Sequence, residues 1–306
     1  MSSQIPIDVY RLFKKLDRNI KFKDIKIICN SHYITEDNSL VYKAGNYIIK
    51  PESKFFISHH YPQIQKLYSI DNKYILNYKN NINLNPNLFY YEYIDGCLLC
   101  TYPDNKNNVV IENIIEFIKF YINIDIDKFD EISNIDSQVK TPIHIVQINN
   151  EKAFNNPLYN NLKKIYDISI KNQKKTKKKL LLVKDLNAHN IIVDKNNNIR
   201  LIDMSDGIMI DYYHLYIHKY FSFLWIFGEK VVNRALKECN IDDNLFVKEL
   251  SLIYFLYQKV PTNGIEFLNK TIHRNWIQRL SFKYKCSRIS KKIIKSLTRR
   301  YPDLLS

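Results

Sequence analysis

The chain has 306 residues, of which 45% are hydrophobic, and it carries 46 Lys or Arg against 31 Asp or Glu. This length and hydrophobic content exclude a disordered chain and allow either one large domain or two lobes. The formal net charge of +15 predicts a positive field that attracts phosphates, nucleic acid or an anionic membrane surface. The composition by itself does not choose among these three.

Cysteine usage and terminal sequence indicate the compartment. The five cysteines are odd in number and scattered, which disfavours the disulfide framework of a small secreted domain. Residues 1–15 lack a basic region followed by an apolar stretch, and the most apolar later stretch, residues 220–228, is about half the length needed to span a bilayer. We therefore expect a cytoplasmic protein, with peripheral association at a membrane surface as an open alternative.

Runs of alternating and β-branched residues dominate the first hundred positions. Clusters of Asn, Asp, Ser and Gly separate these runs, which favours an antiparallel sheet. The predicted strands cover residues 25–29, 39–45, 46–50, 73–79 and 88–94, with one helix near residues 55–69.

The pattern changes after Gly96. Residues 109–124 and 157–172 carry apolar side chains at helical spacing, as do the segments from Tyr212 to the C-terminus. A β-rich part followed by a larger helical part predicts an α+β fold.

Two segments concentrate the positive charge. Residues 171–179 contain six lysines, and residues 273–300 contain ten Lys or Arg and no acidic residue. The second segment also carries apolar residues at intervals, so an ordinary amphipathic helix pair is favoured over a surface for nucleic acid or membrane.

One stretch carries a pattern with chemical meaning: "LLVKDLNAHNIIVDKNNNIRLIDMSD", residues 181–206. Asp185 precedes an apolar segment, Asn190 begins it, and Asp203 follows a second apolar segment after a polar turn, so a β-hairpin would bring the three side chains to one end. Phosphoryl transfer needs a carboxylate and a neutral oxygen on a divalent metal, a second carboxylate at the acceptor hydroxyl, and a cation on the phosphates. Lys50, at the end of "NYIIK", is the candidate cation.

These residues resemble a known family. "DLNAHNIIVDKNNNIRLIDMSD" is similar to the catalytic loop and metal-binding segment of the protein-kinase-like superfamily, in its aminoglycoside phosphotransferase and choline kinase branch. "FYYEYIDG", residues 89–96, resembles the hinge of that branch, and "NSLVYKAGNYIIK" resembles the strand pair that leads to its phosphate-binding lysine. The resemblance runs in order from about residue 25 to about residue 215.

The resemblance implies a two-lobed protein-kinase-like fold. A small antiparallel-sheet lobe would span residues 1–94 and bind the nucleotide, and a larger helical lobe would span residues 95–306. The hinge would lie near residues 92–96, the catalytic loop at 183–190 and the metal-binding segment at 201–206.

The resemblance also implies residue roles and cofactors, which are ATP and Mg²⁺. Asp185 would accept or orient the acceptor's proton, Asn190 and Asp203 would bind magnesium, and Lys50 would contact the nucleotide phosphates. Backbone groups of Glu92, Tyr93 and Ile94 would hydrogen-bond the adenine. Supporting roles would fall to Asp206, Asp211 and His189.

Three features depart from the family pattern. Val183 stands where the family has a His, no Gly-rich loop is evident before residue 42, and the helix expected after Lys50 offers no Glu to pair with that lysine. These departures support an alternative hypothesis, a catalytically impaired pseudokinase that binds a nucleotide or a partner protein.

The favoured hypothesis is an ATP-dependent phosphotransferase that moves the γ-phosphate to a hydroxyl of a small molecule, such as a sugar, an amino alcohol, or a polysaccharide or lipid-linked precursor. The chain is expected to pass almost directly from Asp203 into a helix, which disfavours a protein kinase. Through the basic segment 273–300, an anionic or membrane-associated substrate is a further option, and nucleic acid is disfavoured as a partner.

Overall fold

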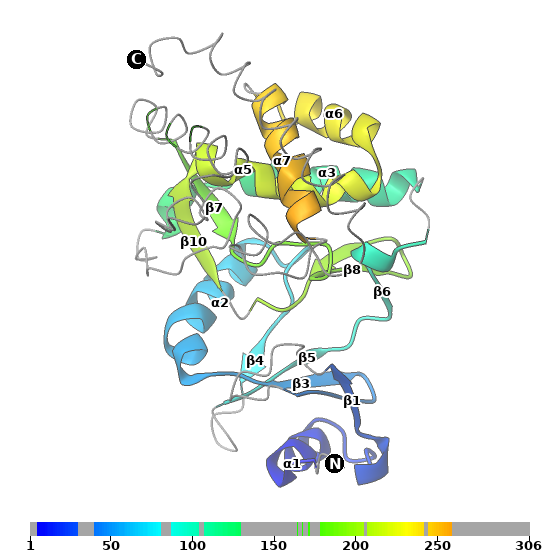
Figure 1. Cartoon of the computed structure of the whole chain (residues 1–306). Helices are drawn as coiled ribbons and strands as arrows, with labels where there is room; N and C mark the ends of the chain where they lie inside the picture. The colour runs from blue at the N-terminus through cyan, green and yellow to red at the C-terminus, as the bar shows by residue number, and fades with distance from the viewer. Residues whose placement is uncertain are drawn as a thin grey trace, which may run out of the picture. The chain divides into compact units, whose positions relative to one another are not determined.

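The computed structural model describes most of the chain in two compact units (Figure 1). The described residues are 5–29, 40–80, 87–103, 107–129, 164, 167, 171, 178–204, 207–241 and 244–258. The first unit comprises Met1–Tyr102 and His189–Ile208, and the second comprises Pro103–Ala188 and Met209–Ser306. The sequence predicts a single boundary near residue 95, which would place residues 189–208 in the helical lobe. In the structure, the contacts of residues 189–208 group them with the sheet-rich first unit.

The first unit is built on a five-stranded antiparallel sheet with the strand order β1-β2-β3-β5-β4. Its strands are β1 Lys26–Cys29, β2 Val41–Ala44, β3 Tyr47–Pro51, β4 Lys79–Asn80 and β5 Leu88–Glu92. The antiparallel sheet predicted for this part of the chain is confirmed.

Helix α1, Ile7–Leu16, covers one face of this sheet and was not among the predicted elements. Its buried residues Val9, Leu12 and Phe13 form one cluster with Ile49 of β3 and Leu88 of β5. Because successive side chains of a strand point to opposite faces, Lys50 points to the face away from α1. The sheet thus has a packed apolar face and a second face that presents the lysine.

The helix predicted near residues 55–69 is confirmed as a π-helical segment, Phe56–His60, that continues into α2, Tyr61–Ile70. The strand predicted at residues 73–79 is wrong, since only Lys79 enters a strand. The Asp71 carboxylate accepts hydrogen bonds from the backbone N–H groups of Lys73 and Tyr74, at 2.9 and 3.0 Å, which turns the chain. Of the apolar residues that follow, Ile75 forms an isolated parallel bridge with Leu201 and the rest are buried in irregular backbone, so their pattern reflects burial more than strand pairing.

A three-stranded antiparallel sheet, β6-β8-β9, completes the first unit. Its strands are β6 Gly96–Leu98, β8 Ile191–Asp194 and β9 Ile199–Leu201. The predicted hairpin is therefore confirmed. A Cβ atom at Gly96 would lie 2.2 Å from the carbonyl oxygen of Val193, so only glycine allows β6 to approach β8 this closely.

The described part of the second unit is mainly helical. It contains α3 Asn108–Ile122, α5 Tyr213–Ser222, α6 Glu229–Glu238 and α7 Asn244–Gln258, together with the strand pair β7 Lys179–Val183 and β10 Ile208–Tyr212. The helix predicted at residues 109–124 is confirmed. Strand β10 lies between Asp203 and α5, so the predicted direct passage into a helix is wrong.

Aromatic side chains form much of the core of the second unit. Phe117 and Tyr121 of α3 lie with ring centroids 4.6 Å apart, and Tyr121 stacks on Tyr220 of α5. The sheet-bearing first unit and the helical second unit confirm the α+β fold class. Among the described helices, none is long and apolar enough to cross a membrane. The predicted helix at 157–172 and the basic segment 273–300 lie outside the described elements, as does most of the lysine run 171–179.

Candidate functional site

The first unit brings Lys50 and Asp203 together although 153 residues separate them in sequence. Lys50 Nζ, at the end of β3, lies 2.6 Å from Asp203 Oδ1. The same ammonium lies 3.0 Å from Oε1 of Glu52. The side chains of Lys50 and Glu52 are only 10% and 7% exposed, whereas that of Asp203 is 49% exposed. One carboxylate is therefore buried with the lysine, and the other is open to a ligand.

Glu52 was not among the predicted site residues. In an extended segment, residues two apart point to the same face, so a Glu two positions after Lys50 is placed to meet the lysine. The predicted absence of a Glu in the following helix is correct, but the inference that Lys50 lacks a carboxylate partner is wrong. The spacing of Lys50 and Glu52 was the signal that could have identified this residue.

The two carboxylates control the charge on Lys50. Burial by itself disfavours the ammonium, but the attraction of Asp203 and of Glu52, with their hydrogen bonds, outweighs it and raises the pKa of Lys50. The lysine is therefore cationic at neutral pH. With one ammonium and two carboxylates, the three side chains carry a net charge of about −1 when all are ionised.

The backbone holds Asp203 in an uncommon conformation. Its φ of 55° lies in the left-handed region, which a non-glycine residue adopts only when its surroundings stabilise it. Two hydrogen bonds hold the backbone of the next residue, Met204. Its N–H donates to the hydroxyl of Tyr78 at 3.4 Å, and its carbonyl accepts from Gly207 N–H at 2.8 Å.

Gly207 is itself tightly packed. Its φ is 73°, and a Cβ atom there would lie 2.4 Å from Nδ1 of the buried His60. Only glycine satisfies both constraints, so Gly207 packs directly against His60 of the π-helical turn that follows β3.

Asn190 lies beside Asp203 through the β8–β9 pairing. Ile191 pairs with Leu201, and the N–H of Ile202 donates to the carbonyl of Asn190 at 2.9 Å. Among the described residues there is no cluster of three or more His, Cys, Asp or Glu that could hold a metal. Asp203 and Asn190, whose backbones are brought close by the β8–β9 pairing, supply the oxygen types that suit Mg²⁺, which binds one or two protein oxygens and completes its shell with phosphates and water.

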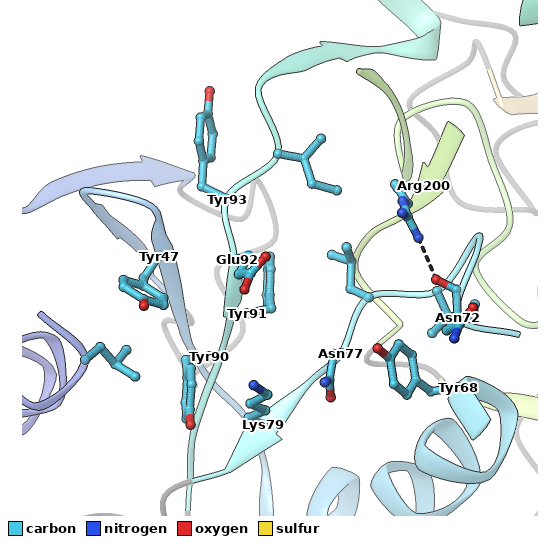
Figure 2. A pocket seen from close by; sticks show the side chains of 14 residues that line it. Tyr47, Tyr68, Asn72, Asn77, Lys79, Tyr90, Tyr91, Glu92, Tyr93 and Arg200 are labelled. Atoms are coloured by element: carbon cyan, nitrogen blue, oxygen red, sulfur yellow. Dashed lines mark hydrogen bonds between the residues drawn. The ribbon is translucent and has the colours of Figure 1, made fainter. Parts of the chain in front are cut away.

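A cavity of about 400 Å³ lies against the predicted hinge (Figure 2). Its lining includes the three predicted hinge residues Glu92, Tyr93 and Ile94, and it is entirely within the first unit. Other residues of the lining come from α1, the β4 region and β9, among them Leu16, Lys79 and Arg200. Lys50, Glu52 and Asp203 do not line this cavity, so it is separate from the ion-paired cluster.

The sheet register shows which backbone groups face away from β3 at the hinge. Tyr93 N–H donates to the carbonyl of Asn46 at 2.8 Å, and Tyr47 is the register partner of Glu92. Because antiparallel pairs alternate, the N–H and C=O of Glu92 point away from β3, toward the β4 side. Strand β4 pairs with β5 only at Tyr90 and Phe89. Within the described residues, no strand therefore pairs with Glu92 on the β4 side of β5.

Asp185 belongs to the second unit, where it follows β7 and is exposed. Asn187 holds it: the Asn187 side-chain amide donates to Asp185 Oδ1 at 2.8 Å and to the Asp185 carbonyl at 3.1 Å. Leu186 N–H donates to the carbonyl of Val183 at 3.3 Å and closes a turn around the aspartate. Asn187 was also not predicted, because short polar side chains at turns are common and carry no distinguishing spacing.

The remaining predicted residues differ in how far the structure describes them. His189 is exposed just before β8, and Asp211 is half-buried in β10. Asp206 lies outside the described residues, as does the segment 30–39 in which a phosphate-binding loop was sought.

Comparison with solved structures identifies the fold. Spectinomycin phosphotransferase APH(9)-Ia with ADP and spectinomycin matches with a TM-score of 0.57 and 13% identity, over 94% of this chain and 98% of the other. Aminoglycoside phosphotransferase APH(2'')-Ib with ADP bound matches at 0.55 and 12%, over 94% and 99%. The streptomycin–ATP complex of APH(2")-IIa matches at 0.55 and 13%, also over 94% and 99%. No protein-family model and no curated protein sequence matches this chain.

Proposed function

We propose that this protein transfers the γ-phosphate of ATP to a hydroxyl of a small molecule. Its fold supports this proposal, because it is the fold of aminoglycoside phosphotransferases within the protein-kinase-like superfamily. The observation that carries this proposal is the 2.6 Å contact between Lys50 and Asp203. Two segments far apart in sequence place a cation and an exposed carboxylate at one point, which is the pairing that a metal-bound polyphosphate requires.

The three ion-paired side chains have separable roles in this proposal. Lys50 binds the non-transferred phosphates, and Asp203 with Asn190 holds Mg²⁺. When bound, the metal would neutralise the charge that develops on the phosphates. Asp203 can exchange its contact with Lys50 for the metal because it is exposed, while buried Glu52 stays with the lysine. Glu52 thus keeps Lys50 in place whether or not nucleotide is bound.

The adenine is proposed to bind at the hinge. The backbone N–H and C=O of Glu92 point away from β3, and Glu92 lines the adjacent cavity. A donor and an acceptor on one exposed strand edge can match the donor and acceptor on the edge of a purine. Tyr93 and Ile94, which line the same cavity, are proposed to contribute through their backbone groups as well.

Asp185 is proposed to act on the acceptor hydroxyl as a general base or as its orienting group. The hydrogen bond from Asn187 to Oδ1 restrains the orientation of the carboxylate, and the exposed position of Asp185 suits it to meet a substrate hydroxyl. The side chain of Val183 cannot supply a polar contact to this loop, so the side-chain support that Asp185 receives comes from other residues.

The acceptor class is proposed to be a small molecule with a free hydroxyl. The neighbouring structures include phosphotransferase complexes with the small molecules spectinomycin and streptomycin. A sugar, an amino alcohol, or a polysaccharide or lipid-linked precursor therefore remains our proposal for this chain. An anionic acceptor recruited by residues 273–300 is a further prediction that the described residues do not address.

The proposal is tested by ADP release with Mg²⁺, ATP and a panel of hydroxyl acceptors. The Asp203→Asn variant removes the metal-binding charge with little change in shape, and we expect it to abolish magnesium-dependent turnover. Asp8→Asn, a change on an exposed face of α1, is the matched control and should leave turnover unaltered. Wild-type activity in Asp203→Asn would overturn the assignment. ATP binding without turnover on any acceptor would favour the pseudokinase alternative.

A further inference from the structure

Helix α5 contains a lysine that is fully buried. Lys219 has 0% relative exposure, although lysine is among the residues least often found inside a protein. An ammonium ion removed from water carries a large desolvation cost unless polar groups compensate it. Its partners therefore indicate what the buried charge is for.

Lys219 reaches the loop that carries Asp185. Its ammonium donates a hydrogen bond to the backbone carbonyl of Lys184, and it lies 5.5 Å from the ring centroid of Tyr254 in α7. The neighbouring Tyr220 donates its hydroxyl to the carbonyl of Leu181 in β7 at 2.7 Å. Lys219 thus bonds the loop next to Asp185, whereas Tyr220 bonds the strand that precedes the loop.

The hydrogen bond from Lys219 acts directly on the position of Asp185. The carbonyl of Lys184 belongs to the peptide unit that joins Lys184 to Asp185, and a peptide unit is planar. Fixing this carbonyl therefore also fixes the N–H and the Cα of Asp185. A charged donor makes a shorter and stronger bond than a neutral one, which suits a loop whose residue 183 is an apolar valine.

We propose that Lys219 is a positioning residue that sets the orientation of Asp185 for phosphoryl transfer. The inference rests on the proposed function, and it assigns a role in the reaction to a helix residue outside the catalytic loop. Asn187 fixes the carboxylate end of Asp185 through the side chain, and Lys219 fixes its backbone end. The two contacts together restrain both ends of the side chain.

The test compares Lys219→Met, which keeps the length of the side chain but removes the donor, with Tyr220→Phe. Tyr220 is equally buried and also bonds a backbone carbonyl, but of β7 rather than of the loop. For Lys219→Met we expect kcat to fall about 10²-fold, as a misplaced catalytic group does, with KM for ATP nearly unchanged. Tyr220→Phe should lower Tm with little change in kcat. Lys219→Arg, which keeps a charged donor, should retain more activity than Lys219→Met.

A second readout does not depend on turnover. Hydrogen exchange at the amides of Asp185 and Leu186 should accelerate about tenfold or more in Lys219→Met, while exchange in α3 stays constant. An unchanged exchange rate would overturn the inference even if the wild-type protein transfers no phosphate. In an active protein, an unchanged kcat in Lys219→Met would also overturn the inference. The same holds if Tyr220→Phe, at the same Tm, loses as much kcat as Lys219→Met.

Discussion

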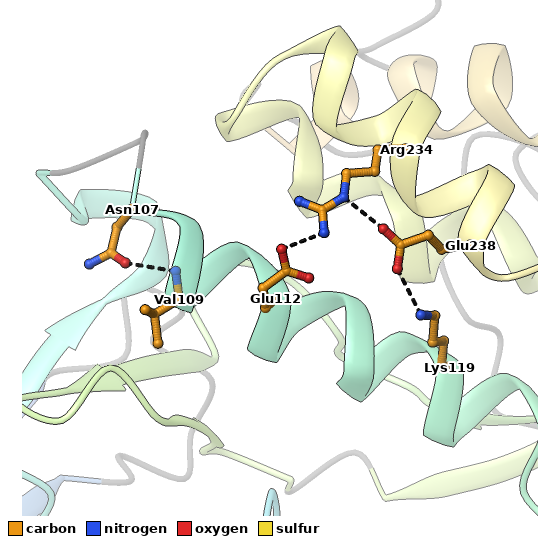
Figure 3. A network of polar contacts seen from close by, with 6 residues as sticks. All are labelled: Asn107, Val109, Glu112, Lys119, Arg234 and Glu238. Atoms are coloured by element: carbon orange, nitrogen blue, oxygen red, sulfur yellow. Dashed lines mark hydrogen bonds and ion pairs between the residues drawn. The ribbon is translucent and has the colours of Figure 1, made fainter.

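Two clusters of ion pairs in this protein each combine a lysine with carboxylates, in different surroundings. In the first unit, Lys50 contacts Glu52 and Asp203. In the second unit, Lys119 of α3 contacts Glu238 of α6 at 2.7 Å, and Arg234 links Glu238 to Glu112 (Figure 3). The side chain of Lys50 is 10% exposed, and that of Lys119 is 40% exposed.

The difference between the clusters lies in their charge balance as well as their burial. The α3–α6 cluster pairs two cations with two carboxylates, so its four side chains are neutral overall. The cluster at Lys50 has an excess carboxylate, and the carboxylate that is exposed, Asp203, is the one that a cation from solution can reach. The α3–α6 cluster joins two helices, whereas the exposed carboxylate of the Lys50 cluster is suited to binding a metal with its phosphates.

The largest effect is expected from removing the buried cation. Lys50→Met leaves Glu52 buried without its ammonium and beside a second carboxylate, so we expect a loss of about 3 to 5 kcal/mol in the free energy of unfolding. Urea denaturation measures this loss, and ATP binding should weaken in parallel. A loss below about 1 kcal/mol, the range of an exposed ion pair, would show that the two clusters are energetically alike.

A smaller effect is expected from neutralising the buried carboxylate. In Glu52→Gln the amide oxygen can still accept a hydrogen bond, but the charge that holds Lys50 is gone. We expect KM for ATP to rise roughly 3- to 10-fold, less than the 10²-fold that a full 1 Å misplacement costs. Steady-state kinetics at varied ATP checks this, and Glu112→Gln in the exposed cluster is the control. Equal kinetics in the two variants would contradict a positioning role for Glu52.

The smallest effect is expected in the exposed cluster. Glu238→Gln should cost about 0.2 to 1 kcal/mol of stability and leave activity unchanged, and the cost should shrink at high salt. Hydrogen bonds from Lys119 and Arg234 lower the pKa of Glu238. Its stabilisation is therefore complete above its ordinary pKa of about 4.3 and is lost as pH falls through the lowered value. Denaturation curves of wild type and variant should converge only once the pH has fallen below the lowered pKa of Glu238; a gap that stays constant as the pH falls would contradict this account.

Sequence patterns predicted those elements whose signals are local. The polar turn between residues 194 and 199 predicted the hairpin, and helical spacing predicted α3. The strand prediction for residues 73–79 was wrong because buried residues on irregular backbone can show the same apolar alternation as a strand. Helix α1 and β10 are short, and each gains its stability from packing or pairing with distant segments, which a local pattern does not contain.

The candidate site was also predicted only where its signal is local in the sequence. Lys50 and Asp203 each stand at the end of a strand-like run, so their positions could be anticipated. Glu52 was visible as a same-face neighbour of Lys50 but was missed because a partner was sought in the following helix. Lys219 could not be predicted, since its contact with residue 184 exists only once α5 packs against β7.

The central claim is that the exposed carboxylate of the Lys50 cluster binds a metal together with a nucleotide. Calorimetric titration of ATP into the folded protein, with and without Mg²⁺, tests it directly, and Asp203→Asn and Asp8→Asn are titrated in parallel. We predict ATP binding that strengthens with Mg²⁺ in wild type and Asp8→Asn and loses this dependence in Asp203→Asn. Binding with no magnesium dependence in the wild-type protein, or no binding at all, would contradict the account.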